Sequence, residues 1–128
     1  MKMKITKRVA VSVETSYQPS YSKPLNGEYV FAYRITVENF GESTIKLLKR
    51  HWYIYDSNGS VREVEGEGVV GQQPVLAPMQ NHQYVSGCHL RTEMGKMSGS
   101  FLMERLEDGK KFYVQIPEFM LVAPFKLN

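Results

Sequence analysis

The stretch E-Y-V-F-A-Y-R-I-T-V-E-N-F, residues 28–40, has the clearest pattern in the chain. Large apolar and aromatic side chains occupy every second position, and the positions between them become polar toward the end. These large apolar and aromatic residues are Tyr29, Phe31, Tyr33, Ile35 and Val37. A period of two is the pattern of a β-strand with one face in a core. The stretch therefore predicts a long strand over Glu28–Phe40 with this face buried.

Similar alternation on either side predicts further strands. They cover Arg8–Ser16, Thr44–Asp56, Val61–Glu65, Asn81–Arg91, Ser100–Leu106 and Lys111–Ile116, and a final extended segment is expected over Phe119–Phe125. The apolar phase of the second of these changes near Leu48–Arg50, which predicts one extra residue in a β-bulge. Asp56–Gly59 and Glu107–Lys110 predict hairpin turns, because their Asn-Gly and Asp-Gly pairs accept positive φ.

Two places are expected to interrupt strands. Gly95, Ser98 and Gly99 should break up the segment before Ser100, since glycine weakens a strand interior. Pro117 should interrupt the last strands, because proline cannot donate to a β-ladder. No window of helical length carries apolar residues at helical spacing, so no long helix is expected.

Short strands joined by turns favour an all-β protein, an antiparallel β-sandwich of seven to nine strands of the immunoglobulin-like or fibronectin type III-like class. Trp52 is expected to supply a buried aromatic side chain to its core. The single cysteine, Cys88, excludes the disulfide-bonded antibody type. A length of 128 residues is that of one domain. We therefore expect one domain over residues 1–128, with its core at about 8–125.

The composition excludes several classes of function. The net charge of +3 is only mildly basic, and the densest cluster, Lys46, Lys49 and Arg50, is too small to predict nucleic-acid binding. No apolar run is long enough to cross a bilayer, and no signal-peptide core follows the basic N-terminus. With one cysteine, the fold does not depend on an oxidising compartment. We expect a cytoplasmic protein with no nucleic-acid partner and no membrane insertion.

The segment G-E-G-V-V-G that begins at Gly66 matches the glycine pattern of dinucleotide-binding loops. Such a loop leads from a strand into a helix, and Pro74 and Pro78 forbid a helix of useful length here. Two interpretations remain. Gly66, Gly68 and Gly71 could present backbone N–H groups to the phosphate of a nucleotide or pyrophosphate, or they could allow a bulge or a tight crossing between sheets.

Three glutamates spaced by two are candidate metal ligands. Glu63, Glu65 and Glu67 would share one face of a strand, with neighbours about 6.5–7 Å apart. Such a row could attract a hard divalent cation. However, it lacks ligands that converge from several directions, and it is more typical of a solvated edge strand that resists aggregation. The histidines and Cys88 lack the spacing of a structural zinc site.

No motif of enzyme catalysis occurs in the sequence. It has no nucleophile elbow, no H-E-x-x-H and no Walker loop. Asp56 and Asp108 lie in predicted turns, where aspartate is expected to make local hydrogen bonds. We therefore expect a protein that is not an enzyme, without catalytic residues and without a cofactor.

A protein partner, whose identity the sequence does not reveal, is the expected ligand. Tyr53 and Tyr55 have the parity opposite to Trp52 and Ile54, so they could form an exposed interaction face, for which tyrosine is well suited. Alternatively, that second face also packs or is covered by neighbouring side chains. An open sheet edge would also permit a homodimer.

An ordered set of motifs resembles one known family. After Trp52-Tyr53-Ile54 come V-E-G-E-G-V-V-G-Q-Q-P (64–74), Y-V-S-G (84–87), G-K-M-S-G (95–99) and Ile116-Pro117. This order is similar to that of the ApaG family, over about Val9 to Phe125. The resemblance implies a bacterial cytoplasmic β-sandwich of poorly defined biochemical role, with a link to cobalt and magnesium efflux. It also implies binding to other proteins, because similar domains occur in eukaryotic F-box and polymerase-interacting proteins.

Overall fold

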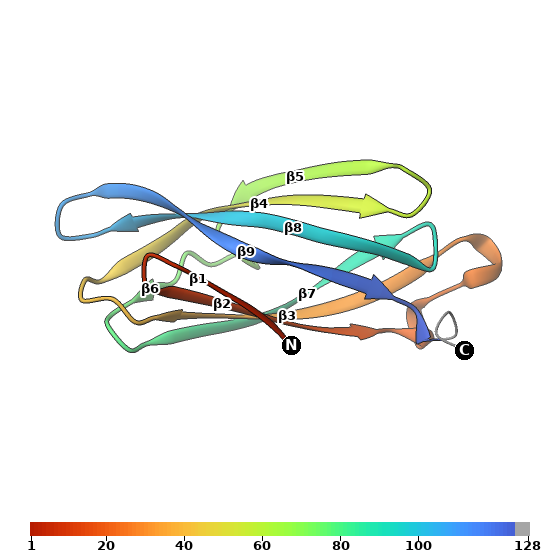
Figure 1. Cartoon of the computed structure of the whole chain (residues 1–128), viewed down its shortest axis with the longest axis horizontal. Coiled ribbons are helices and arrows are strands. Elements are labelled where there is room, and N and C mark those ends of the chain that lie inside the picture. Colours follow the sequence, from red (N-terminus) through yellow and green to blue (C-terminus); the bar gives the residue numbers. More distant parts are fainter. Residues whose placement is uncertain (125–128) are drawn as a thin grey trace.

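The computed structural model describes residues 1–124, which form two antiparallel sheets stacked face to face (Figure 1). The first sheet has the order β1 (Lys2–Thr6), β2 (Val9–Tyr17), β3 (Tyr29–Asn39) and β7 (Asn81–Leu90). The second has the order β5 (Val61–Glu67), β4 (Ile45–Asp56), β8 (Met94–Arg105) and β9 (Lys110–Val122), and β6 (Val75–Leu76) pairs with β4. Two 3-10 turns, η1 (Pro19–Tyr21) and η2 (Pro24–Asn26), lie between β2 and β3. The expected all-β sandwich of seven to nine strands is confirmed.

The stretch with the clearest alternation forms β3, between β2 and β7 in the first sheet. Its expected core face is confirmed, because four side chains on that face are at most 5% exposed. They are Phe31, Tyr33, Ile35 and Val37. Tyr29, at the start of the strand, is half-buried and packs against this core.

Three aromatic rings join the two sheets. Tyr33 of β3 meets Trp52 of β4 edge-on, with ring centroids 5.3 Å apart, and lies 5.9 Å from Phe119 of β9. Trp52 and Phe119 are perpendicular at 5.9 Å. Trp52 is 2% exposed, so the expected buried aromatic side chain is confirmed. Edge-to-face contacts of this kind add about 0.5–1.5 kcal/mol per pair to the area that the rings bury.

The expected bulge in β4 lies at Leu48. Leu47 and Lys49 pair with consecutive residues of β8, so Leu48 is the extra residue. Before the bulge the odd-numbered side chains are buried, and after it Trp52 and Ile54 are buried. The bulge thus accounts for the change of apolar phase that the sequence shows.

The expectation that Gly95, Ser98 and Gly99 break up their segment is wrong, because β8 starts before them and runs through. The two glycines lie inside the strand because β4 is too close to leave room for a side chain. A Cβ at Gly99 would overlap the carbonyl oxygen of His51 and would lie 3.2 Å from Cε3 of Trp52. Glycine here permits the close approach of two backbones rather than ending a strand.

The expectation that Pro117 interrupts the last strands is also wrong, because β9 is continuous. Met97 pairs with Phe119, and Gly99 pairs with Ile116. Between these two pairs, two residues of β9, Pro117 and Glu118, lie opposite one residue of β8, Ser98, which makes a second bulge. The ladder is locally disrupted there, so a residue without an N–H is tolerated. Phe125, the expected end of the final segment, lies outside the described residues.

The sequence does not predict β1, whose apolar side chains Met3 and Ile5 are 57% and 58% exposed. This edge strand pairs with β2 and lies beside β9 (Figure 1). The backbone N–H of Gln115 in β9 donates to Oγ1 of Thr6 at 3.2 Å. One side of the sandwich is therefore nearly closed.

The opposite side, between β5 and β7, is bridged by the side chain of Arg62. Its guanidinium donates to the carbonyl oxygen of His89 and lies 3.9 Å from Sγ of Cys88. Cys88 is 4% exposed, and burial raises the pKa of its thiol to about 11 although the nearby arginine acts in the opposite direction. No helix in residues 1–124 is long and apolar enough to cross a membrane.

The substitution Gly99→Ala should lower the free energy of unfolding by about 1–3 kcal/mol, the usual cost of forcing extra atoms into a well-packed site. The added methyl group would press on the backbone of β4 and on Trp52. Ser98→Ala is the matched control, since this neighbouring residue is half-buried, and it should change stability by less than about 0.5 kcal/mol. Urea unfolding of both variants measures the difference, and equal stabilities would refute the close approach.

Alkylation of Cys88 should be slow in the folded protein. With a thiol pKa of about 11, about one thiol in a thousand is ionised near pH 8, and only the thiolate reacts. The rate should rise with pH toward that pKa, and it should rise sharply when guanidinium chloride unfolds the chain. Mass spectrometry after timed exposure to iodoacetamide follows both effects; similar rates in the folded and unfolded states would contradict the burial.

Candidate metal-binding site

The hairpin of β4 and β5 pairs side chains that are separated in the sequence. Its turn is stabilised by Asn58, whose Oδ1 accepts a hydrogen bond from the backbone N–H of Ser60 at 3.0 Å. Gly59 supplies the positive φ of 94° that the turn needs. The register that follows from this turn places His51 directly opposite Glu65.

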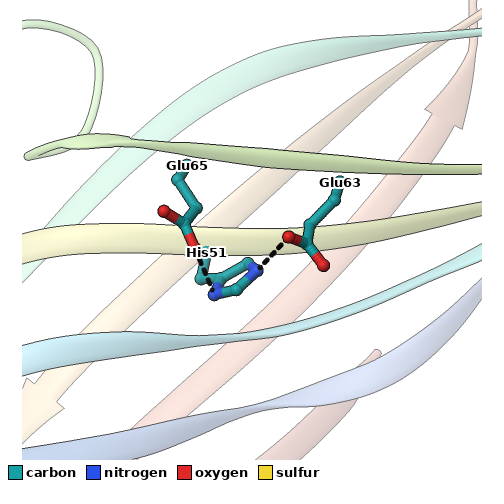
Figure 2. A group of neighbouring side chains, drawn as sticks. All are labelled: His51, Glu63 and Glu65. Carbon is teal, nitrogen blue, oxygen red and sulfur yellow. Dashed lines mark ion pairs between the residues drawn. The ribbon is translucent and has the colours of Figure 1, made fainter.

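On the outer face of the second sheet, His51 lies between two carboxylates (Figure 2). Its Nδ1 is 3.1 Å from Oε1 of Glu65, and its Nε2 is 3.6 Å from Oε2 of Glu63. The side chain of His51 is 28% exposed, whereas those of Glu63 and Glu65 are 56% and 66% exposed. The cluster is therefore shielded around the imidazole and open to solvent at the carboxylates.

Neighbouring groups hold the imidazole ring in place. Tyr53 stacks on His51, with ring centroids 4.7 Å apart and planes inclined by 24°. Nε2 of His51 is shielded from solvent and has no hydrogen-bond partner within residues 1–124. A shielded polar atom without a hydrogen bond is costly. This nitrogen is therefore available to a metal ion or, when it carries a proton, to the ion pair with Glu63.

The donor set of this cluster fits a divalent transition-metal ion. One nitrogen of His51 and one oxygen each of Glu63 and Glu65 lie within 4.8 Å of one another. Imidazole with carboxylates suits Co²⁺, Ni²⁺ or Zn²⁺, whereas Mg²⁺ prefers oxygen ligands and keeps its waters. Three protein ligands leave coordination positions for water or for a donor from another molecule. In the absence of an ion, both carboxylates lie within ion-pair distance of the imidazole nitrogens.

Two of the three glutamates that the sequence singles out lie in this cluster. Glu63 and Glu65 point to His51, whereas Glu67 lies opposite Lys49 in the ladder and outside the cluster. All three belong to β5, an edge strand whose side chains are nearly all exposed.

The two candidate interface tyrosines lie beside the cluster on the outer face. Tyr53 covers His51, and Tyr55 lies under Nζ of Lys96 at 5.0 Å from its ring centroid. Both rings are half-buried by such neighbours, so they present part of their surface to solvent.

The glycine stretch forms the end of β5 and a tight turn after it. Gly68 and Gly71 have φ of 62° and 76°, which side-chain-bearing residues rarely adopt. The backbone N–H groups of Gly68, Val69 and Gln72 donate to backbone carbonyl oxygens at 2.8, 2.7 and 3.0 Å. These three amides are therefore already used within the fold.

A cation lies over the start of the same stretch. The guanidinium of Arg50 fills the space that a side chain at Gly66 would take, and it donates to the carbonyl oxygens of Glu67 and Gly68 at 3.0 and 3.1 Å. The turn thus presents carbonyl oxygens to a cation on this side, whereas an anion nest presents N–H groups.

His51 is the site residue that the strand pattern alone does not reveal. The parity of β5 groups the glutamates, but their partner is on another strand. The hairpin turn carries the missing signal, because it pairs Tyr55 with Val61, and counting back along both strands reaches His51 and Glu65. The predicted hairpin therefore contains the signal that places His51 beside the glutamates.

The chain is similar to the members of one family along most of its length. The ApaG domain model matches residues 19–105. Protein ApaG of Rhodopseudomonas palustris is 46% identical over 120 residues, 94% of this chain and 92% of that protein, and Protein ApaG of Azoarcus sp. is 46% identical over 123 residues, 96% of each. A crystal structure described as the ApaA protein of Bordetella pertussis has a TM-score of 0.87 at 44% identity, covering 91% of this chain and 94% of that one. The chain therefore belongs to the ApaG family.

Proposed function

We propose that the protein is a cytoplasmic, non-enzymatic binding module that holds a divalent transition-metal ion at His51, Glu63 and Glu65. The observation that carries the proposal is a shielded imidazole nitrogen, without a hydrogen bond in residues 1–124, beside two carboxylates within 4.8 Å. The sequence contains no catalytic motif, and the single buried cysteine suits a reducing compartment. The site gives a concrete form to the link with cobalt and magnesium homeostasis that the family resemblance implies.

The chemistry of the donors favours cobalt over magnesium as the ion that is bound. A nitrogen ligand adds little for Mg²⁺, which is reluctant to lose water, but it strengthens binding of Co²⁺. A protein of this kind would respond to cobalt in the presence of a large excess of magnesium. Its part in efflux would then be regulatory, through binding of the ion rather than through transport.

A regulatory role needs a partner, and the outer face supports binding to another protein. The ion would have free coordination positions at the solvent-open side of the cluster. Tyr53 and Tyr55 lie beside it with part of each ring exposed, and tyrosine is enriched at interfaces. We propose that a partner protein binds over this face and that the bound ion contributes to the contact.

Calorimetric titration of Co²⁺ into the full chain should show one saturable site. His51→Ala, and separately the pair Glu63→Gln and Glu65→Gln, should weaken binding by at least about 10-fold, since even the loss of an outer-shell group costs a metal site 10–100-fold. Mg²⁺ should bind much more weakly than Co²⁺. Absence of Co²⁺ binding to the unaltered protein would refute the site.

Glu67→Gln is the matched control for this titration. It removes the same charge from the same strand but outside the cluster, so the affinity for Co²⁺ should change by no more than about 2-fold, as expected for an exposed, screened charge. If Glu67→Gln weakened binding as much as the cluster variants, the ion would be held by the general negative charge of β5.

Partner capture should depend on the metal ion. Immobilised protein is exposed to bacterial extract with Co²⁺ or with a chelator, and retained proteins are identified by mass spectrometry. A partner should be retained with Co²⁺, lost with the chelator and lost with His51→Ala, while Glu67→Gln should retain it. Retention that is indifferent to the chelator would separate protein binding from the metal site.

The alternative function, binding of a nucleotide or pyrophosphate by Gly66–Gly71, has less support. The amides of Gly68 and Val69 are used in backbone hydrogen bonds, and the carbonyl oxygens of Glu67 and Gly68 face Arg50. An anion there would have to be bound by the remaining amides and by a guanidinium that is already bonded.

A further inference from the structure

A positively charged hollow lies at one end of the sandwich, away from the metal-binding cluster. It has a volume of about 270 Å³ and is bounded by the β1–β2 turn, the β3–β4 connection and the β8–β9 hairpin. Its charged lining residues are Lys7, Arg8, Glu42, Arg105 and Lys110. Its apolar lining is formed by Val9, Ile45 and Phe112. Four cationic side chains therefore share the hollow with one carboxylate.

The cations of this hollow are unequally neutralised. Arg105 is paired with two carboxylates: its Nε lies 3.1 Å from both oxygens of Asp108 and 3.7 Å from Oε1 of Glu107, and a terminal nitrogen lies 2.6 Å from Oδ2 of Asp108. Arg8 lies 3.8 Å from Glu42, and both side chains are largely exposed, so this pair is loose. Within residues 1–124, neither Lys7 nor Lys110 has a carboxylate within ion-pair distance, although Asp108 attracts Lys110 from further away.

The turn that carries two of these cations has an unfavourable backbone. Lys7 and Arg8 are the two residues between β1 and β2, and both have positive φ, 48° and 66°. A two-residue hairpin turn of this type strongly prefers Asn-Gly, because most side chains disfavour the left-handed region. Strained backbone persists where the surrounding structure imposes it, and it clusters at functional sites. Here the strained positions are those that bring two cations to the hollow.

We propose that this hollow is a binding site for a small phosphate-bearing molecule, held by Lys7, Arg8 and Lys110. A phosphate group carries up to two negative charges and three acceptor oxygens, which match several converging cationic donors better than a single carboxylate does. The apolar lining beside the cations, including the Phe112 ring, would contact the organic part of a phosphate ester. This site shares no residue with the metal-binding cluster or with the Gly66–Gly71 turn.

The test is calorimetric titration of the full chain, at low salt and with a chelator present. Inorganic phosphate, pyrophosphate and glycerol 3-phosphate are titrated separately, so the strongest ligand indicates whether a free phosphate or an ester is preferred. We expect saturable binding of at least one of them, weakening as salt is added, because the partly exposed charges are screened. Failure of all three to bind overturns the proposal.

Two neighbouring lysines provide a matched pair of variants. Lys110 lines the hollow, whereas Lys111 does not, although both are exposed and adjacent in β9. Lys110→Gln should weaken binding by about 10-fold, the effect of losing a hydrogen bond to a charged group. Lys111→Gln should leave the affinity nearly unchanged. Equal losses in the two variants would mean non-specific attraction to a basic surface and would overturn the site.

Two further variants should change the affinity for phosphate in opposite directions. Glu42→Gln removes the only carboxylate among the described lining residues, so it should strengthen phosphate binding. Replacing the turn by Asn-Gly, Lys7→Asn with Arg8→Gly, should raise the melting temperature by a few degrees and reduce binding. A lower melting temperature, or binding at full strength, would show that the strained turn does not serve this site.

Discussion

The contact of Trp52 with its surroundings is the constraint on which the rest of the structure depends. The indole lies against the backbone at Gly99 on its own sheet and meets Tyr33 from the other sheet. Close packing leaves no room for these elements to slide, so β4 is fixed relative to both β8 and β3. The backbone of β4, from which His51 reaches toward β5, is therefore held in place by the core beneath it.

The edge strand β5 has features of both interpretations that the sequence leaves as alternatives. Its exposed glutamates protect an open sheet edge from pairing with another chain, as charges on edge strands do. The same glutamates lie beside an imidazole from the neighbouring strand. Solubility and ligand binding thus need not compete for these positions, and a solvated edge is a suitable place for an ion that must exchange with solution.

The elements that could be predicted from sequence are those whose pattern lies within one strand. The alternation of residues 28–40 predicts the core face of β3, and the phase change predicts the bulge at Leu48. Gly99 and Pro117 misled because their roles depend on a neighbouring strand, which local sequence does not describe. The sequence does not reveal His51 for the same reason, whereas strand parity alone places Glu63 and Glu65 on one face. The family assignment used motifs from the whole chain and is confirmed.

The bulge at Leu48 has a consequence for how this family can vary. One residue upstream of the site shifts the parity of everything after it, so Trp52 faces inward and His51 outward. An insertion or deletion of a single residue between Ile45 and His51 would exchange these two faces. A substitution in this segment leaves the two faces of the strand in place, whereas a change in its length inverts them. We therefore expect alignments of relatives to be free of gaps across it.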